Sequence, residues 1–167
     1  KLSRRLSLPA PIKGFLGGCL LILIAAGISV DYLGLGLRTI EHALNGNPVN
    51  WYAFLLKNIT TAITLSFEGV GGIITPVLFI GACSGNLFAQ LFNLDLSLFS
   101  SLGFVGLLAG TTNTPIAASI MAIEVFGPSI APYAALVCII TFLFTGHRSV
   151  YPSQILTFKK SHFSQGD

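Results

Sequence analysis

Charged side chains are almost absent from the middle of this sequence, and that scarcity restricts the fold more than any other feature. Between Lys57 and His147 the only carboxylates or basic side chains are Glu68, Asp95 and Glu124. Over the whole chain 9% of residues are charged, whereas soluble domains carry roughly 25%. A soluble fold of this size could not bury the apolar surface of a chain that is 53% hydrophobic. The sequence therefore predicts an all-α integral membrane protein, because helices satisfy their own backbone hydrogen bonds in lipid.

Basic residues gather at the two ends of the chain and predict its orientation. Basic residues that flank apolar spans favour the cytoplasmic side of a membrane. We therefore expect residues 1–10 and 159–167 to be cytoplasmic ends, in a bacterial inner membrane. A nucleic-acid-binding patch is the rival interpretation, which the apolar centre disfavours. The residues concerned are Lys1, Arg4, Arg5 and Lys13 at one end and Arg148, Lys159 and Lys160 at the other.

The first third of the chain predicts one span followed by a loop. Pro11 to Ser29 is an apolar run of about the length that crosses a bilayer. Asp31 to Asn50 is rich in glycine and polar residues and predicts a loop with a short helix around Leu37 to Leu44. Trp51 and Tyr52 then stand where aromatic residues anchor a helix at a membrane interface.

Glycine and proline interrupt the apolar segments of the remaining chain. Each break is followed by a new apolar helix with proline near its first turn, where the missing N–H costs nothing. Backbone groups that lose their helical partners at membrane depth are tolerated only where they are buried in protein or line a cavity. Transporters contain such broken helices and point the ends of the half-helices at ions. We therefore predict a polytopic membrane protein with broken and re-entrant helices, forming one domain over residues 1–167. The breaks are Gly69 to Pro76, Gly110 to Pro115, Gly127 to Pro132 and Gly146 to Pro152.

The break from Gly69 to Pro76 has the composition of an anion site. Its three glycines free the backbone, and Pro76 begins a predicted helix from Val77 to about Phe92. A helix start carries a partial positive charge and unpaired N–H donors, so it binds anions without a cationic side chain. A plain helix–loop–helix turn explains the same residues equally well on spacing alone.

Four segments in sequence resemble the CLC family of chloride channels and anion/proton antiporters. Gly71 to Pro76 is similar to the family's Gly-x-Phe-x-Pro signature at the central chloride site. Gly103 to Pro115, Ile116 to Gly127 and Ser149 to Gln154 resemble the lead into the dimer-interface helix, that helix, and the segment bearing the anion-contacting tyrosine. The resemblance implies the C-terminal half of a CLC-like domain, which is one half of an inverted repeat.

The resemblance also implies which residues bind the anion. The backbone N–H groups of Ile73 and Ile74 would face it, with Gly72 and Thr75 beside them in the signature. The hydroxyl of Tyr151 would close the site from the cytoplasmic side, because a phenol is a good neutral donor. A tyrosine of the membrane interface is the alternative interpretation of Tyr151.

Two positions depart from the chloride members of the family, and one departs from its fluoride-exporting branch. Ile74 replaces the signature phenylalanine, and Thr75 stands where many chloride members have alanine. The fluoride-exporting branch usually has a glutamate at the position of Ile73, which argues against fluoride. Other segments resemble that same branch, namely Thr75-Pro76, Tyr32 to Gly36 and Phe144 to His147.

The implied function is transmembrane transport of small anions, most of all chloride, by a channel or a chloride/proton antiporter. A fluoride/proton antiporter and a non-conducting, truncated membrane assembly piece are the alternatives. No nucleophile–base pair is evident, so we do not expect an enzyme.

The three cysteines lack the spacing of metal ligands or of a disulfide, and we predict that they are small buried residues. They are Cys19, Cys83 and Cys138. We expect no cofactor or metal, and a halide ion as the bound substrate.

The partners that the resemblance implies are a second copy and the N-terminal half of the same protein. The family forms homodimers through helices that correspond to Ile116 to Gly127 and Ile130 to Phe144. The N-terminal half would supply the gating glutamate, which has no counterpart here. Glu68 and Glu124 lie beside glycine breaks and suit structural roles better than a proton relay. Membrane lipid is the remaining expected partner.

Overall fold

All regular structure in the described part of the chain is helical, as the sequence predicts. The structure is a computed structural model that describes residues 9–27, 30–67, 69, 71–145 and 149–150. Two short 3-10 helices, η2 (Val30–Tyr32) and η3 (Pro128–Ile130), join longer elements. The α-helices are α1 (Ala10–Gly27), α2 (Leu37–Leu44), α3 (Ala53–Ser66), α4 (Ile74–Phe92), α5 (Leu96–Thr112), α6 (Pro115–Phe126) and α7 (Ala131–Phe144).

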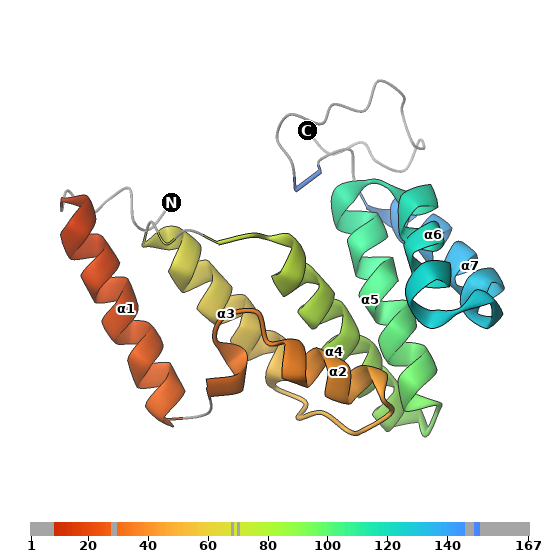
Figure 1. Cartoon of the computed structure of the whole chain (residues 1–167), viewed down its shortest axis with the longest axis horizontal. Helices are drawn as coiled ribbons and strands as arrows, with labels where there is room; N and C mark the ends of the chain where they lie inside the picture. Colours follow the sequence, from red (N-terminus) through yellow and green to blue (C-terminus); the bar gives the residue numbers. More distant parts are fainter. Residues whose placement is uncertain (1–8, 28–29, 68, 70, 146–148, 151–167) are drawn as a thin grey trace.

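The helices form a row rather than a closed bundle. Helices α1, α3, α4 and α5 lie side by side in that order, and each contacts the next (Figure 1). The short α2 runs across the row near its lower end in this view and contacts α4 and α5. Helices α6 and α7 contact each other and pack on α5 at the far end of the row.

The predicted glycine and proline breaks are confirmed wherever the structure describes them. Helix α5 is followed by Asn113, whose φ of 58° is left-handed, and Pro115 begins α6. Helix α6 is followed by Gly127 with a φ of 89°, a conformation that favours glycine. The short helix predicted at Leu37 to Leu44 is α2. Of the break Gly146 to Pro152, only residues 149 and 150 are described.

Glycine lets α4 and α5 approach each other closely. A Cβ atom added at Gly85 would overlap the carbonyl oxygen of Phe99, and one at Gly81 would overlap that of Gly103. In turn, a Cβ atom at Gly103 would overlap the carbonyl oxygen of Gly81. Small residues at helix interfaces are the usual basis of tight packing in lipid, where no hydrophobic effect drives helices together. The α4–α5 pair is thus the rigid centre of the fold.

A buried amide fastens the segment after α2 onto this pair. Asn86 of α4 has no exposed surface, and its Oδ1 accepts a 3.0 Å hydrogen bond from the N–H of Val49. Its Nδ2 donates to the carbonyl oxygen of Asn47 at 3.1 Å and to Ser100 Oγ of α5 at 3.0 Å. Buried polar groups that are fully paired favour one arrangement of their elements. Asn86 therefore sets how α2 lies across the row.

Only α4 is both long and apolar enough to cross a bilayer by itself among the described helices. The apolar stretches Pro11–Gly27, Leu96–Thr112, Pro115–Phe126 and Pro128–Phe144 are shorter. Large apolar side chains nevertheless face outward along α6 and α7. Those exposed are Ile116, Ile120, Ile123, Val125, Leu136, Ile139, Ile140, Leu143 and Phe144. Apolar surface of this extent marks contact with lipid or with another protein surface.

Candidate functional site

Helix α4 begins at Ile74, three residues before the predicted start at Val77. Pro76 is consequently the third residue of the helix rather than the residue before it. The first four N–H groups of any helix lack an intrahelical acceptor, so proline is tolerated here for the same reason as at the first position. The earlier start brings Ile74 and Thr75 into the first helical turn.

The first turn of α4 presents unpaired backbone donors. Among the residues that the structure describes, none accepts a hydrogen bond from the N–H groups of Ile73, Ile74 or Thr75. The side chains of Ile73 and Ile74 are 37% and 44% exposed. Gly72, just before them, has no atom within 4 Å of the position that a Cβ would take. The four residues predicted for an anion site from this segment therefore lie together at an open helix start.

The C-terminal end of α5 borders this helix start. A small cavity of about 10 Å³, here called the α4 cavity, is lined by residues of α4, α5 and the segment after α7. That volume is of the order that one water molecule requires. The lining residues are Ile73, Ile74, Val77, Leu108, Thr111, Thr112 and Val150. Val150 thus lies at the predicted anion site.

Tyr151, the fifth predicted site residue, lies outside the described residues. Its neighbour Val150 is described, and the N–H of Val150 donates to the carbonyl oxygen of Thr111 at 2.9 Å. Of the two intramembrane glutamates considered, Glu124 is exposed near the end of α6, and Glu68 is not described. Among the described residues, no three His, Cys, Asp or Glu side chains are grouped as metal ligands would be.

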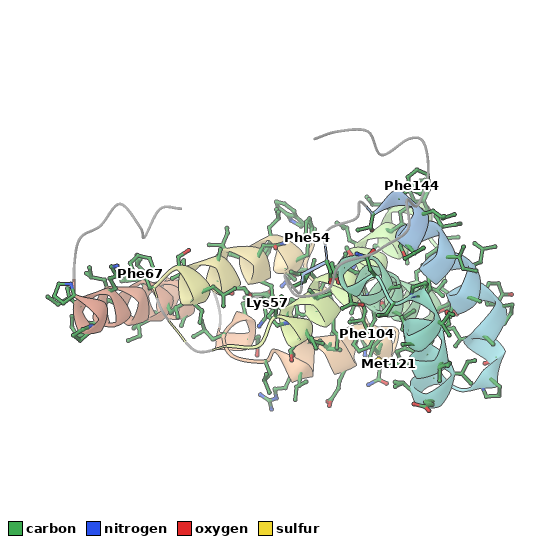
Figure 2. All side chains as sticks on the ribbon, turned by 90° about the horizontal axis from the view of Figure 1, so that it is seen from above. Phe54, Lys57, Phe67, Phe104, Met121 and Phe144 are labelled. Atoms are coloured by element: carbon green, nitrogen blue, oxygen red, sulfur yellow. The ribbon has the colours of Figure 1, made fainter. Side chains whose placement is uncertain are left out.

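Lys57 is the polar residue that the sequence analysis missed. It lies in α3, is 2% exposed, and projects between α3 and the segment that precedes α2 (Figure 2). Its Nζ donates to the carbonyl oxygen of Gly34 at 2.6 Å and lies 3.4 Å from that of Tyr32. The ring of Phe79 lies 5.0 Å from Nζ, within cation–π range. An ionisable residue inside an apolar helix is a functional candidate by default, and that signal was present in the sequence.

A larger cavity surrounds Lys57 and extends to the glycines before α4. This space, the Lys57 cavity, has a volume of about 360 Å³. Its polar lining comes from Lys57 and the threonines of α3 and from Tyr32 of η2, and its apolar lining comes from leucines and a proline. The lining residues are Leu21, Tyr32, Leu33, Gly34, Leu35, Lys57, Thr60, Thr61, Thr64, Leu65, Gly71, Gly72 and Pro76.

Comparison with known proteins gives the same family from sequence and from fold. The chain is 38% identical over 167 residues to the chloride/fluoride channel protein of Pseudomonas syringae pv. tomato, which covers 95% of this chain and 36% of that protein. It is 29% identical over 160 residues to the voltage-gated ClC-type chloride channel ClcB of Escherichia coli O9:H4, covering 87% and 38%.

A solved structure shares the fold. The crystal structure of a CLC-type fluoride/proton antiporter matches with a TM-score of 0.82 and 29% sequence identity, over 90% of this chain and 38% of that one. The chain thus spans little more than a third of the length of these proteins. A family model described as voltage gated chloride channel matches residues 1–146. The predicted resemblance is confirmed, and the chain belongs to the voltage-gated chloride channel, or CLC, family.

Proposed function

We propose that the protein containing this chain transports small halide ions across a bacterial membrane, with chloride as its principal ion. The observation that carries the proposal is the first turn of α4, where the N–H groups of Ile73, Ile74 and Thr75 have no acceptor among the described residues. Gly72 precedes them without steric obstruction. These donors would form one wall of the anion site.

Backbone donors suit transport better than a cationic side chain would. A helix start offers roughly half a unit of positive charge together with N–H groups. An ion held by such neutral donors can leave again, which conduction requires. The hydroxyl of Tyr151 would add one further neutral donor, and the contact of Val150 with Thr111 supports its placement near α4.

Fluoride is the second candidate ion, and the comparisons favour it specifically. The relative from Pseudomonas syringae carries fluoride in its name, and the matching structure is of a fluoride/proton antiporter. The departure at Ile73, where the fluoride-exporting branch usually has glutamate, supports chloride. Channel and exchanger both remain compatible with the proposal, because the N-terminal half would contain the gating glutamate.

The remaining proposals concern assembly and orientation. The chain would form the C-terminal half of the membrane domain, with its ends at 1–10 and 159–167 in the cytoplasm. The outward apolar surfaces of α6 and α7 support a homodimer through these two helices. The open start of α4 supports a further contact with the N-terminal half, which would cover it.

Halide efflux from liposomes tests the function directly. The complete protein is reconstituted, and chloride and fluoride efflux are recorded with ion-selective electrodes at a fixed pH gradient. Chloride efflux at least as fast as fluoride efflux is the expected result. Strong preference for fluoride would move the protein to the second candidate. No flux of either ion, from correctly folded protein, would overturn the transport proposal and favour a non-conducting assembly piece.

A further inference from the structure

We infer that the Lys57 cavity is a second anion site, which receives a monovalent inorganic anion next to the first turn of α4. This inference rests on the proposed halide transport and deepens it.

Lys57 is a buried cation without an ionic partner in the described part of the chain. No carboxylate there lies within 4.0 Å of its Nζ, and its recorded contacts are two backbone carbonyl oxygens and the Phe79 ring. Removing a charge from water costs several kcal/mol unless an opposite charge and good hydrogen bonds replace the solvent. Two carbonyl oxygens engage at most two of the three ammonium protons. A mobile anion in the cavity would supply both the missing charge and the third acceptor.

The other polar groups of the cavity include donors placed to bind the same ion. Thr61 follows Lys57 by one helical turn, so both occupy the same face of α3, and both line the cavity. The hydroxyl of Thr61 has no hydrogen-bond partner among the described residues. Those of Thr60 and Thr64 already donate to carbonyl oxygens within α3. Lys57 and Thr61 are therefore the side chains that the structure leaves available to an anion.

Among the described residues no carboxylate lines the cavity, and leucines contribute much of its remaining wall. Leu21, Leu33, Leu35 and Leu65 line it, and Gly71 and Gly72 bring bare backbone to its edge. A positive group between low-dielectric walls attracts anions from solution more strongly than the same group at a free surface. A volume of about 360 Å³ exceeds that of a bare halide. The ion would thus be held together with some of its water.

The position of the cavity gives the second site its role. Gly71 and Gly72 line the Lys57 cavity, while Ile73 and Ile74, the next two residues, line the α4 cavity. The two cavities therefore have lining residues that follow one another along the short stretch from Gly71 to Ile74. Conduction through neighbouring sites is fast because an ion that enters one repels the ion in the next. Lys57 would concentrate anions one step before the helix start that binds them.

Bromide provides a direct probe, because its anomalous scattering locates it in crystals of the complete protein. The expected result is one bromide near the start of α4 and a second near Lys57 and Thr61. Bromide titration should show that the second position binds bromide with roughly tenfold lower affinity in Thr61→Val, because the variant loses a hydrogen bond to the ion. Thr61→Ser, which keeps the hydroxyl, is the matched control and should retain the wild-type occupancy.

Changes at Lys57 test the charge itself. Lys57→Met should abolish the second bromide, while Lys57→Arg should retain it. Since Lys57 also holds the segment before α2, the bromide at the α4 site verifies that each variant is folded. Bromide at α4 alone in the wild type would overturn the Lys57 site and leave halide transport standing. Bromide at neither position, together with no halide flux, would overturn the proposed function and this inference with it.

Discussion

The N–H of Val150 donates a hydrogen bond to the carbonyl oxygen of Thr111, with an N···O distance of 2.9 Å. The hydroxyl of Ser149 lies 3.5 Å from the same oxygen. The two contacts hold residues 149 and 150 against the C-terminal end of α5, and both Val150 and Thr111 line the α4 cavity. Residues that are 39 positions apart are therefore neighbours at the candidate anion site. This relationship is the structural reason to test Tyr151, the next residue in the chain.

Replacement of Tyr151 by phenylalanine should weaken anion binding. The variant removes one hydroxyl and preserves the ring, so the expected loss is roughly tenfold in chloride affinity, which is the effect of one hydrogen bond to an ion. Isothermal titration calorimetry on the complete protein measures it. Tyr133→Phe is the matched control, because Tyr133 lies exposed on α7 and outside the α4 cavity. Equal affinities in wild type and Tyr151→Phe would remove the tyrosine from the site.

Replacement of Ile74 by phenylalanine, the residue of the family signature, should leave halide affinity within about threefold of wild type. Such a change corresponds to less than about 1 kcal/mol of binding free energy. The proposed donors are backbone N–H groups, which the substitution keeps. Ile74 is already 44% exposed, so a larger ring fits without displacing the core. Calorimetry with chloride and with fluoride checks both ions. A loss of more than a hundredfold would show that the side chain, rather than the backbone, determines binding.

Alanine at Gly85 should destabilise the α4–α5 pair. The added methyl group would overlap the carbonyl oxygen of Phe99, which belongs to rigid backbone. Overpacking of this kind costs about 1–3 kcal/mol. Gly18→Ala is the control, because a Cβ there meets no atom within 4 Å. Thermal unfolding in detergent should show a lower transition temperature for Gly85→Ala only. A similar transition for both variants would mean that the helices separate without difficulty.

The sequence predicted the helices of this fold well because glycine and proline mark their ends by local chemistry. Helix α2 and the breaks near Asn113 and Gly127 depend on residues within a few positions of themselves. The predicted start of α4 was three residues too late, because proline is acceptable anywhere in the first turn of a helix. Pro76 alone therefore does not determine where the helix begins. Family resemblance, rather than local pattern, selected Ile73, Ile74 and Thr75 as site residues.

The contacts between distant segments could not be predicted in this way. Lys57 binds the carbonyl oxygen of Gly34, and Asn86 binds the N–H of Val49, which lies 37 positions away. No periodicity or motif in the sequence pairs these residues. Lys57 did carry a recognisable signal, since it is the one charged residue of its apolar helix, whereas Asn86 did not. Long-range polar contacts depend on how the helices pack, and so they appear only with the structure.

Replacement of Asn86 by alanine should lower the free energy of unfolding by more than the loss of packing around the deleted amide group explains. The substitution leaves the buried N–H of Val49 without its acceptor, and such an unpaired group costs about 1–3 kcal/mol. Asn58→Ala is the matched control, since the exposed Asn58 only donates to the carbonyl oxygen of Phe54, and it should change stability by less than about 0.5 kcal/mol. Thermal unfolding of the complete protein in detergent compares the two.

The Ser100→Ala variant and the double variant then isolate the 3.0 Å contact between Asn86 and Ser100. When two residues share a hydrogen bond, the effects of their substitutions on the free energy of unfolding are not additive. Strict additivity would mean that Asn86 acts through its bonds to residues other than Ser100, such as Val49 and Asn47, and that α5 is fastened to α4 by its glycine contacts rather than by this amide.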